Sequence, residues 1–172
     1  HWCANRLGQK QTSGTRPATP ELIINREGED PDTLALPYAL YSNDDLGRRV
    51  VYVESTRGCP HHCLYCTSCG THWRRFPTDR LFAAFESLLE RGLRDFRFLD
   101  RTFNADESHA VTVLDFFLQR LPKGLRIHLE LTPSRLGAPL LERLAAFPSD
   151  ALHLEVGIQT LAEKVAGHIG RR

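Results

Sequence analysis

The sequence of 172 residues contains no methionine, not even at position 1, and several other features are missing as well. No apolar run approaches the roughly 20 residues that cross a bilayer, and the opening HWCANRLGQK lacks the apolar region of a signal peptide. The formal net charge is only +1, so composition gives no argument for a nucleic acid or an anionic membrane surface. We expect a cytoplasmic globular protein with neither as a partner, and we interpret the chain as an internal piece of a longer protein.

Cysteine is scarce outside one short segment. Four of the five cysteines lie in CPHHCLYCTSCG, residues 59–70. A secreted disulfide scaffold usually spreads an even number of cysteines along the chain, whereas clustered thiols in a reducing compartment usually hold metal. We therefore expect a metal site rather than disulfides.

Signals of regular structure are also rare in the first quarter of the chain. Residues 1–45 include QKQTSGTRPATP and NREGEDPDT, polar stretches whose Gly, Pro and Thr are typical of linkers. We interpret residues 1–45 as a linker or the end of a preceding domain. Within them we expect a short strand at 21–24 and an extended segment at 34–42 that packs on a neighbour. Residues 46–172 form the second unit.

From residue 50 onward, predicted strands alternate with predicted helices. Runs of β-branched and aromatic residues predict strands at 50–54, 95–100, 125–131 and 151–159. Apolar residues at helical spacing predict helices at 79–92, 106–122, 138–147 and 162–169. Repeats of about thirty residues suit βαβ crossovers and a parallel sheet. The fold class is therefore α/β, with about four parallel βα units that form either half of a (β/α) barrel or the core of an open sheet.

Local signals refine the helices. Thr78 is a candidate N-cap for the first helix, Gly92 is a C-terminal stop, and Pro139 suits a first helical turn because its missing N–H costs nothing there. We expect the apolar stripe of the second helix to consist of Val111, Leu114, Phe117, Leu118 and Leu121.

Carboxylates recur at or near the carboxyl ends of the predicted strands, at Glu54, Asp100, Glu130 and Glu155, with Gln159 in phase with Glu155. In parallel α/β folds the ligand site lies at that end. The alternative is that these groups are neutralised inside the sheet by Arg97, Arg101, Arg126 or Arg135. Because the pattern repeats on four strands, we favour a polar mouth that binds a charged ligand.

The cysteine spacing leaves two kinds of metal site open. Cys59, Cys63 and Cys66 form C-x3-C-x2-C, which can hold three irons of a [4Fe–4S] cluster and leave the fourth without a protein ligand. With Cys69 as a fourth ligand, the same segment suits a closed zinc or iron–sulfur site in a non-catalytic recognition module. The loop follows the first strand and so lies at the carboxylate-lined end, which favours the open cluster.

The motif and its surroundings resemble the radical SAM superfamily. C-x3-C-x2-C with Tyr65 before its last cysteine, after the first strand of a βα repeat, is similar to that superfamily's cluster loop. ESTRGCPHHCLYCTS, FLDRTFN, HLELTPSRL and LHLEVGIQT together resemble a subgroup that carries a cobalamin-binding domain ahead of the barrel. The resemblance runs from about residue 31 to the end, and it implies that residues 46–172 are the N-terminal half of a radical SAM (β/α) barrel.

The resemblance also implies a chemistry. The open iron of the cluster would be chelated by S-adenosylmethionine, which is cleaved to a 5′-deoxyadenosyl radical or used in cobalamin-dependent methyl transfer on an unknown substrate. The cobalamin would belong to a domain outside this chain, and the electron donor would be a protein such as flavodoxin or ferredoxin.

Further residue roles follow from the same resemblance. The segment that contacts the amino group of S-adenosylmethionine falls on residues 99–102, although Asp100 and Arg101 stand where the family has glycines. The implied cofactor-binding residues are Tyr65 near the adenine, Asp100, Arg101 and Thr102 in that segment, Glu130 at the amino-acid end, Gln159 at the ribose, and Arg171 at the carboxylate.

Several neighbours have plainer interpretations. Cys69 is a free thiol if the three-cysteine pattern is complete, and Cys3 is a linker or core thiol. His61 and His62 are solvated loop residues or tune the cluster. His128 and His153 either face substrate or are satisfied in the interior, and HWRRF at 72–76 is a surface loop or binds an anionic substrate.

Overall fold

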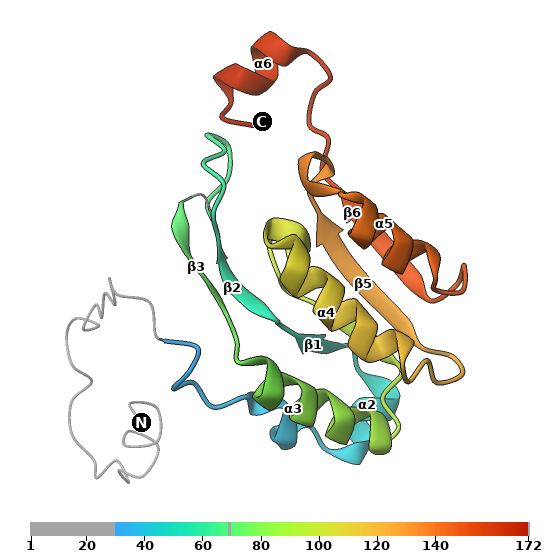
Figure 1. Ribbon diagram of the computed structural model, residues 1–172. Coiled ribbons are helices and arrows are strands. Elements are labelled where there is room, and N and C mark those ends of the chain that lie inside the picture. Colours follow the sequence, from blue (N-terminus) through green and yellow to red (C-terminus); the bar gives the residue numbers. More distant parts are fainter. Residues whose placement is uncertain (1–29, 69, 172) are drawn as a thin grey trace, which may run out of the picture.

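The computed structural model describes residues 30–68 and 70–171. Its centre is a parallel sheet in the order β1 (Val51–Val53), β4 (Asp95–Phe98), β5 (Arg126–Leu131) and β6 (Leu152–Val156). A helix follows β4, β5 and β6 in turn, and another precedes β4 (Figure 1). The predicted α/β fold class, a partial barrel of four parallel strands, is confirmed. These helices are α3 (Thr78–Glu90), α4 (Glu107–Leu118), α5 (Ala138–Ala145) and α6 (Glu163–His168).

Phenylalanine dominates the contact between the sheet and its helices. The ring of Phe85 from α3 lies 5.8 Å from Phe96 and 5.7 Å from Phe98 of β4, centroid to centroid, and 5.8 Å from Phe117 of α4. Each of these rings is at most 1% exposed, and full burial of one such side chain stabilises a fold by about 1.5–3 kcal/mol. The core therefore lies between β1, β4 and β5 on one side and α3 and α4 on the other.

The helix predictions succeeded in part. Leu114 and Phe117 of the predicted α4 stripe are fully buried, but α4 ends at Leu118, so Leu121 lies beyond the helix and is 37% exposed. Gly92 ends α3 with φ +97° and Pro139 stands in the first turn of α5, both as predicted. Thr78 is not the cap of α3: the helix follows Pro77 without a side-chain cap. A side-chain cap is present at α4, where Asp106 accepts a hydrogen bond from the backbone N–H of His109.

The segment before the sheet is helical rather than extended. A 3-10 turn (η1, Pro37–Leu40) leads into α2 (Asn43–Arg48), whose first turn is closed by a capping box between Ser42 and Asp45. The extended form predicted for 34–42 is therefore wrong, but its packing on a neighbour is correct, because Tyr38 is buried 6.0 Å from the ring of Phe85. The predicted strand at 21–24 lies outside the described residues, and the boundary near residue 45 stays a prediction.

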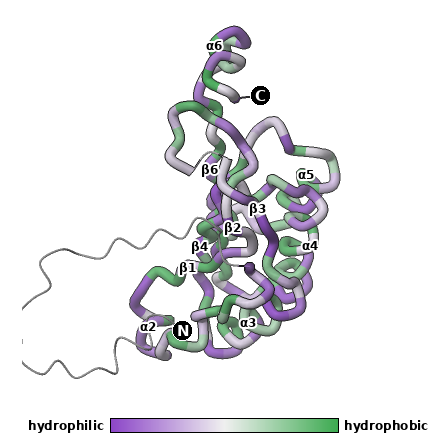
Figure 2. The backbone as a smooth tube through the Cα atoms, turned by 90° about the vertical axis from the view of Figure 1, so that its left-hand side faces the viewer, coloured by the Kyte–Doolittle hydropathy of each residue, from purple (hydrophilic) through white to green (hydrophobic). Residues whose placement is uncertain are grey.

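A hairpin inside the cysteine segment was not predicted. β2 (Thr56–Cys59) and β3 (Thr71–Arg75) pair antiparallel, where the sequence indicated only a long loop. The register shifts at Gly58, which has φ +86° and lies so close to β3 that a Cβ would be 2.2 Å from the His72 carbonyl oxygen. HWRR of this stretch therefore lies in β3, and Figure 2 shows this strand as a hydrophilic stretch.

The two faces of the sheet differ as their alternation predicts. In β5 the apolar residues Ile127, Leu129 and Leu131 are at most 5% exposed. His128 and Glu130 lie on the opposite face, in register with His153 and Glu155 of β6. Across residues 30–68 and 70–171, no helix combines the length and the apolar content that a membrane span requires.

Candidate functional site

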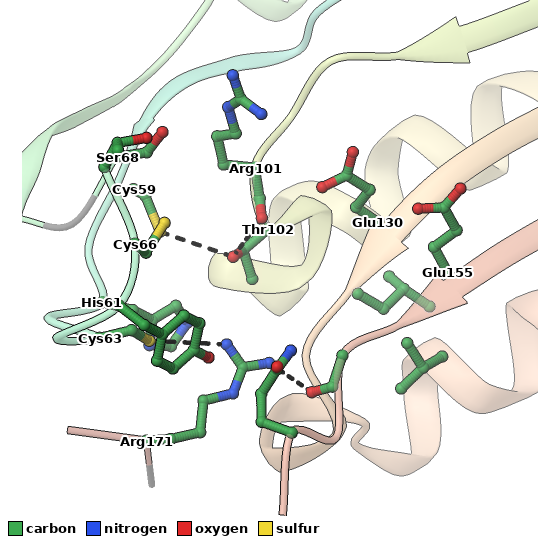
Figure 3. A pocket seen from close by; sticks show the side chains of 16 residues that line it. Cys59, His61, Cys63, Cys66, Ser68, Arg101, Thr102, Glu130, Glu155 and Arg171 are labelled. Carbon is green, nitrogen blue, oxygen red and sulfur yellow. Dashed lines mark hydrogen bonds between the residues drawn. The ribbon is translucent and has the colours of Figure 1, made fainter. Parts of the chain in front are cut away.

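A cavity of about 550 Å³ opens where the cysteine segment meets the carboxyl ends of β5 and β6. Side chains from five separate parts of the chain point into it (Figure 3). Its wall contains every predicted site residue except Asp100: Cys59, Cys63, Tyr65, Cys66, Arg101, Thr102, Glu130, Gln159 and Arg171. Its remaining wall residues are His61, Thr67, Ser68, Leu131, Glu155, Val156 and Gly157.

All three motif cysteines are free thiols on this wall. The hairpin holds the first of them, because the backbone N–H of Cys59 donates to Thr71 Oγ1 at 2.9 Å. The Thr71 hydroxyl in turn donates to the Ser68 carbonyl, which closes the loop that contains Cys63 and Cys66. Cys59 and Cys63 are buried and Cys66 is half-buried, so the thiols face the cavity rather than bulk water.

Two polar groups approach the sulfur atoms. Thr102 Oγ1 lies 3.8 Å from Cys59 Sγ, and Nη1 of Arg171 lies 3.7 Å from Cys63 Sγ (Figure 3). Iron–sulfur clusters are held by thiolates, and hydrogen bonds to sulfur set their potentials. Three free thiols on one cavity, two of them with such a neighbour, fit a cluster. Cys69, the proposed fourth ligand of a closed site, and Cys3 lie outside the described residues.

The C-terminal segment brings Arg171 to the site across more than a hundred residues. The backbone N–H of Leu64 donates to the Ile169 carbonyl at 3.0 Å, so the end of α6 lies against the cysteine loop. Gly170 makes this approach possible: it has φ +70°, and a Cβ there would be 2.5 Å from the His62 carbonyl oxygen. Arg171 then donates from Nη2 to the Gly157 carbonyl at 2.6 Å, which joins the loop after β6 to the cysteine loop.

Asp100 does not line the cavity. It is buried and accepts hydrogen bonds from the Ser55 N–H and hydroxyl and from the Thr56 hydroxyl, at 2.6–2.9 Å. Burial raises the pKa of Asp100 to about 6, and the hydrogen bonds from Ser55 and Thr56 oppose that rise. In the structure this carboxyl ties the end of β4 to the start of the cysteine segment.

The other strand-end acids have different surroundings. Glu130 and Glu155 stand side by side on the cavity wall, whereas Glu54 pairs with Arg57. Of the four arginines considered for neutralising these acids, none forms an ion pair with Glu130 or Glu155 in the described part of the chain. A hydrogen bond from His128 and the charge of that ring lower the pKa of Glu155.

The loop after β6 has an unusual backbone. Gln159 adopts φ +64°, a left-handed conformation that non-glycine residues seldom adopt and that often marks functional sites. Gly157 keeps space for its neighbours, since a Cβ there would lie 2.9 Å from Gln159 Nε2 and 3.1 Å from Arg171 Nη2. Sequence reasoning missed Gly157 and Ser68. Gly157 could have been found from its place in GIQT, whereas no sequence signal pointed to Ser68.

His61 is more than a solvated loop residue. It is half-buried on the cavity wall, and burial followed by the charges of Arg135 and Arg171 lowers its pKa. A neutral imidazole has one nitrogen that donates and one that accepts, so His61 could offer either to a group bound by the three cysteines on the same cavity wall.

Comparison with known proteins finds relatives in sequence and neighbours in fold. No protein-family model matches it. An uncharacterised methyltransferase of Pyrococcus horikoshii is 30% identical over 127 residues, 70% of this chain and 27% of that protein. The ribosomal protein uS12 methylthiotransferase RimO of Moorella thermoacetica is 27% identical over 159 residues, 88% of this chain and 36% of that protein. The chain thus spans only about a third of the length of these relatives, or less.

Solved structures show the same fold. The radical S-adenosylmethionine methyltransferase TsrM of Kitasatospora setae, solved with cobalamin and a [4Fe–4S] cluster, aligns over 69% of this chain and 22% of that one. The TM-score is 0.58 at 22% identity. A second structure of TsrM, with tryptophan and a SAM analogue, aligns over 68% of this chain with the same TM-score. In its half-barrel fold and its C-x3-C-x2-C loop at the strand ends, the chain is similar to radical SAM methyltransferases.

Proposed function

We propose that the chain is the cluster-bearing half of a radical SAM enzyme. In this proposal Cys59, Cys63 and Cys66 hold a [4Fe–4S] cluster, and the cavity beside them binds S-adenosylmethionine. The bound cluster would supply the electron that cleaves the sulfonium to methionine and a 5′-deoxyadenosyl radical. The observation that carries the proposal is the convergence of three free thiols with acidic, amide and guanidinium groups on one cavity.

The side chains suit a zwitterionic nucleoside ligand. Glu130 is an acceptor for an ammonium group, Gln159 is an amide for ribose hydroxyls, and Arg171 is a donor for a carboxylate. Arg171 also contacts Cys63 Sγ and the Gly157 carbonyl, so it would hold the ligand's carboxylate close to the cluster. Tyr65 lies on the same wall and offers its ring to the adenine.

The three predicted contacts at residues 100–102 have different surroundings. Thr102 is buried next to Cys59 Sγ and lines the cavity with Arg101, so both remain candidate contacts. Asp100 is bonded to Ser55 and Thr56, and we propose that it positions the cysteine segment rather than touching the ligand.

We propose methyl transfer as the reaction class, because one relative is named a methyltransferase, another a methylthiotransferase, and the fold neighbour is a methyltransferase. Cobalamin, if used, would be held by a part of the protein outside this chain. The substrate is unassigned. We propose flavodoxin or ferredoxin as the electron donor, and the cytoplasm as the compartment that keeps the thiols reduced.

Anaerobic reconstitution tests the cluster. We expect about four irons and four sulfides per chain with a broad brown absorbance. Cys63→Ala should lose this cluster, whereas Cys69→Ala should keep it. Tight zinc without iron, or loss of all metal in Cys69→Ala, would contradict the open cluster and support a closed four-thiolate module.

Ligand binding is tested separately with the reconstituted chain. Glu130→Gln should weaken S-adenosylmethionine binding at least tenfold in equilibrium dialysis, because the ammonium group loses its carboxylate partner. Glu142→Gln, an exposed acid on α5, is the matched control and should bind like the wild type. Equal affinity of the two variants would remove Glu130 from the proposed site.

A further inference from the structure

Two histidines and a glutamate form a cluster deeper in the half-barrel than the cysteines. His128 and His153 are register partners on β5 and β6, and their rings stack at 5.1 Å with an interplanar angle of 26°. His128 Nε2 lies 2.9 Å from Glu155 Oε1. Because residues two apart on a strand share a face, all three side chains lie on the face of Glu130, which lines the cavity.

The separations suit one small cation. One nitrogen or oxygen of each residue lies within 4.8 Å of the corresponding atoms of the other two. Ligands of tetrahedral zinc, held at about 2.0–2.1 Å, are about 3.3 Å from one another. The 2.9 Å pair is slightly closer than this. Since His153 and Glu155 are exposed, side-chain rotation alone can adjust the set.

The buried member of the cluster has unused hydrogen-bonding capacity. His128 is only 7% exposed, and its Nδ1 is buried without a hydrogen-bond partner among the described residues. Such an atom is costly to bury unless a ligand or another polar group satisfies it. Nε2 of the same ring faces Glu155, so the two nitrogens of His128 have different surroundings.

The surrounding charge limits the affinity but does not prevent binding. Arg97 of β4 is the register partner of His128 and so lies on the same face, where its positive charge acts on Glu155. Glu130 is the register partner of Glu155 and adds a second negative charge on that face. Arg126 and Asp95 on the same face pair with each other, so the carboxylates of Glu130 and Glu155 stand against the guanidinium of Arg97.

We propose that His128, His153 and Glu155 bind one divalent cation of the zinc type, separate from the cysteine site. Two histidines and a glutamate are a ligand set that catalytic zinc sites use, and a three-ligand site keeps its fourth position open to water or substrate. Because Glu155 also lines the cavity, the open position lies beside the space proposed for S-adenosylmethionine.

Zinc binding to the full chain with its cluster reconstituted tests the site. After exposure to zinc and desalting, we expect one zinc per chain in addition to iron. His153→Ala should weaken zinc binding at least tenfold, because it removes one of three ligands while leaving an exposed position that does not affect folding. His72→Ala, an exposed histidine on β3, is the matched control and should bind zinc like the wild type.

Zinc-edge X-ray absorption separates this site from the thiols. We expect only nitrogen and oxygen neighbours, at about 2.0–2.1 Å, whereas a cysteine-held ion would show sulfur at about 2.3 Å. Absence of bound zinc, sulfur in the first shell, or equal binding by His153→Ala and His72→Ala would overturn the proposal. Because iron content is measured on the same samples, loss of the cluster is distinguishable from loss of the zinc site.

Discussion

Strands β5 and β6 have nearly the same sequence and very different surroundings. IHLEL of β5 and LHLEV of β6 pair in register, so each places two polar residues on the cavity face and apolar residues on the other. Ile127 and Leu129 of β5 are at most 1% exposed, whereas Leu154 and Val156 of β6 are 38% and 41% exposed. The alternation determines which face is apolar, but whether that face is buried depends on a covering helix.

The position of α6 explains the difference. β5 is covered by helices that contribute Leu114, Phe117 and Leu140 to the core. α6 lies beyond the carboxyl end of the sheet, against the cysteine loop, and not over β6 (Figure 1). The same sequence pattern thus occurs in β5, where it packs in the core, and in β6, where the apolar face is partly exposed and the strand end lines the cavity.

The largest expected effect is on packing. Leu129→Ala should destabilise the chain by about 2–5 kcal/mol, because it leaves a cavity in a fully buried site. Leu154→Ala, the matched change at its register partner, should cost about 1 kcal/mol or less, since that side chain is already more than a third exposed. Denaturant unfolding of both variants measures the comparison, and equal losses would show that β6 is covered in solution.

The second expected effect concerns acids at the ends of neighbouring strands. Asp100 after β4 is buried, and its pKa is raised from 3.8 to about 6, whereas Glu155 at the end of β6 is exposed and its pKa is lowered. Because the pKa of Asp100 is higher in the folded state, its protonated form contributes to stability. This contribution is fully present below pH about 4 and is lost as the pH rises through about 6. A difference of about two between the folded and unfolded pKa corresponds to about 3 kcal/mol.

Asp100→Asn should remove that pH dependence. We expect the free energy of unfolding of the wild type, relative to Asp100→Asn, to fall between pH 4 and pH 7. The measurement is a set of denaturant curves across this range. A constant difference between the two proteins would mean that the Asp100 carboxyl titrates as in the unfolded chain.

The smallest expected effect is on the docking of α6. Gly170→Ala should separate the end of α6 from the cysteine loop, because its Cβ would collide with the His62 carbonyl and its φ is positive. The strain costs about 1–3 kcal/mol locally. Hydrogen exchange at the Leu64 amide, which donates to Ile169, should become faster.

Gly167→Ala, a change inside α6, provides the matched control. Gly167 has free space around its Cβ position, so alanine there should stabilise α6 by about 0.5–1 kcal/mol. Exchange at Leu64 should then stay unchanged or slow down. If both variants speed up exchange equally, the contact seen at Gly170 does not hold α6 in place.

Much of the fold was predictable because its signals are local. Period-two alternation located β5 and β6, and Gly92 marked the end of α3, since each depends on a few adjacent residues. The hairpin β2–β3 was missed because its strands are short and polar and are held together by Gly58 and Thr71 across the intervening loop. No sequence pattern separates such a hairpin from an irregular loop.

The candidate site was predictable in membership but not in arrangement. C-x3-C-x2-C and the acids at the strand ends predict which groups line the cavity, because residue type and spacing can be read from short stretches of sequence. Asp100 shows the limit: it is a strand-end acid like Glu130 and Glu155, but it is buried and bonded to Ser55 and Thr56 instead of lining the cavity.

Alternation, helix signals and cysteine spacing can be read from neighbouring residues, and they predict the parallel sheet of βα units and a metal site in the cysteine segment. Contacts between segments that are far apart in the chain cannot be read in this way, because they depend on tertiary packing. The approach of Arg171 to Cys63, the exposure of the outer face of β6, and the meeting of His128, His153 and Glu155 all depend on how strands and helices dock. Docking is governed by the shape and burial of whole surfaces, which no single stretch of sequence contains.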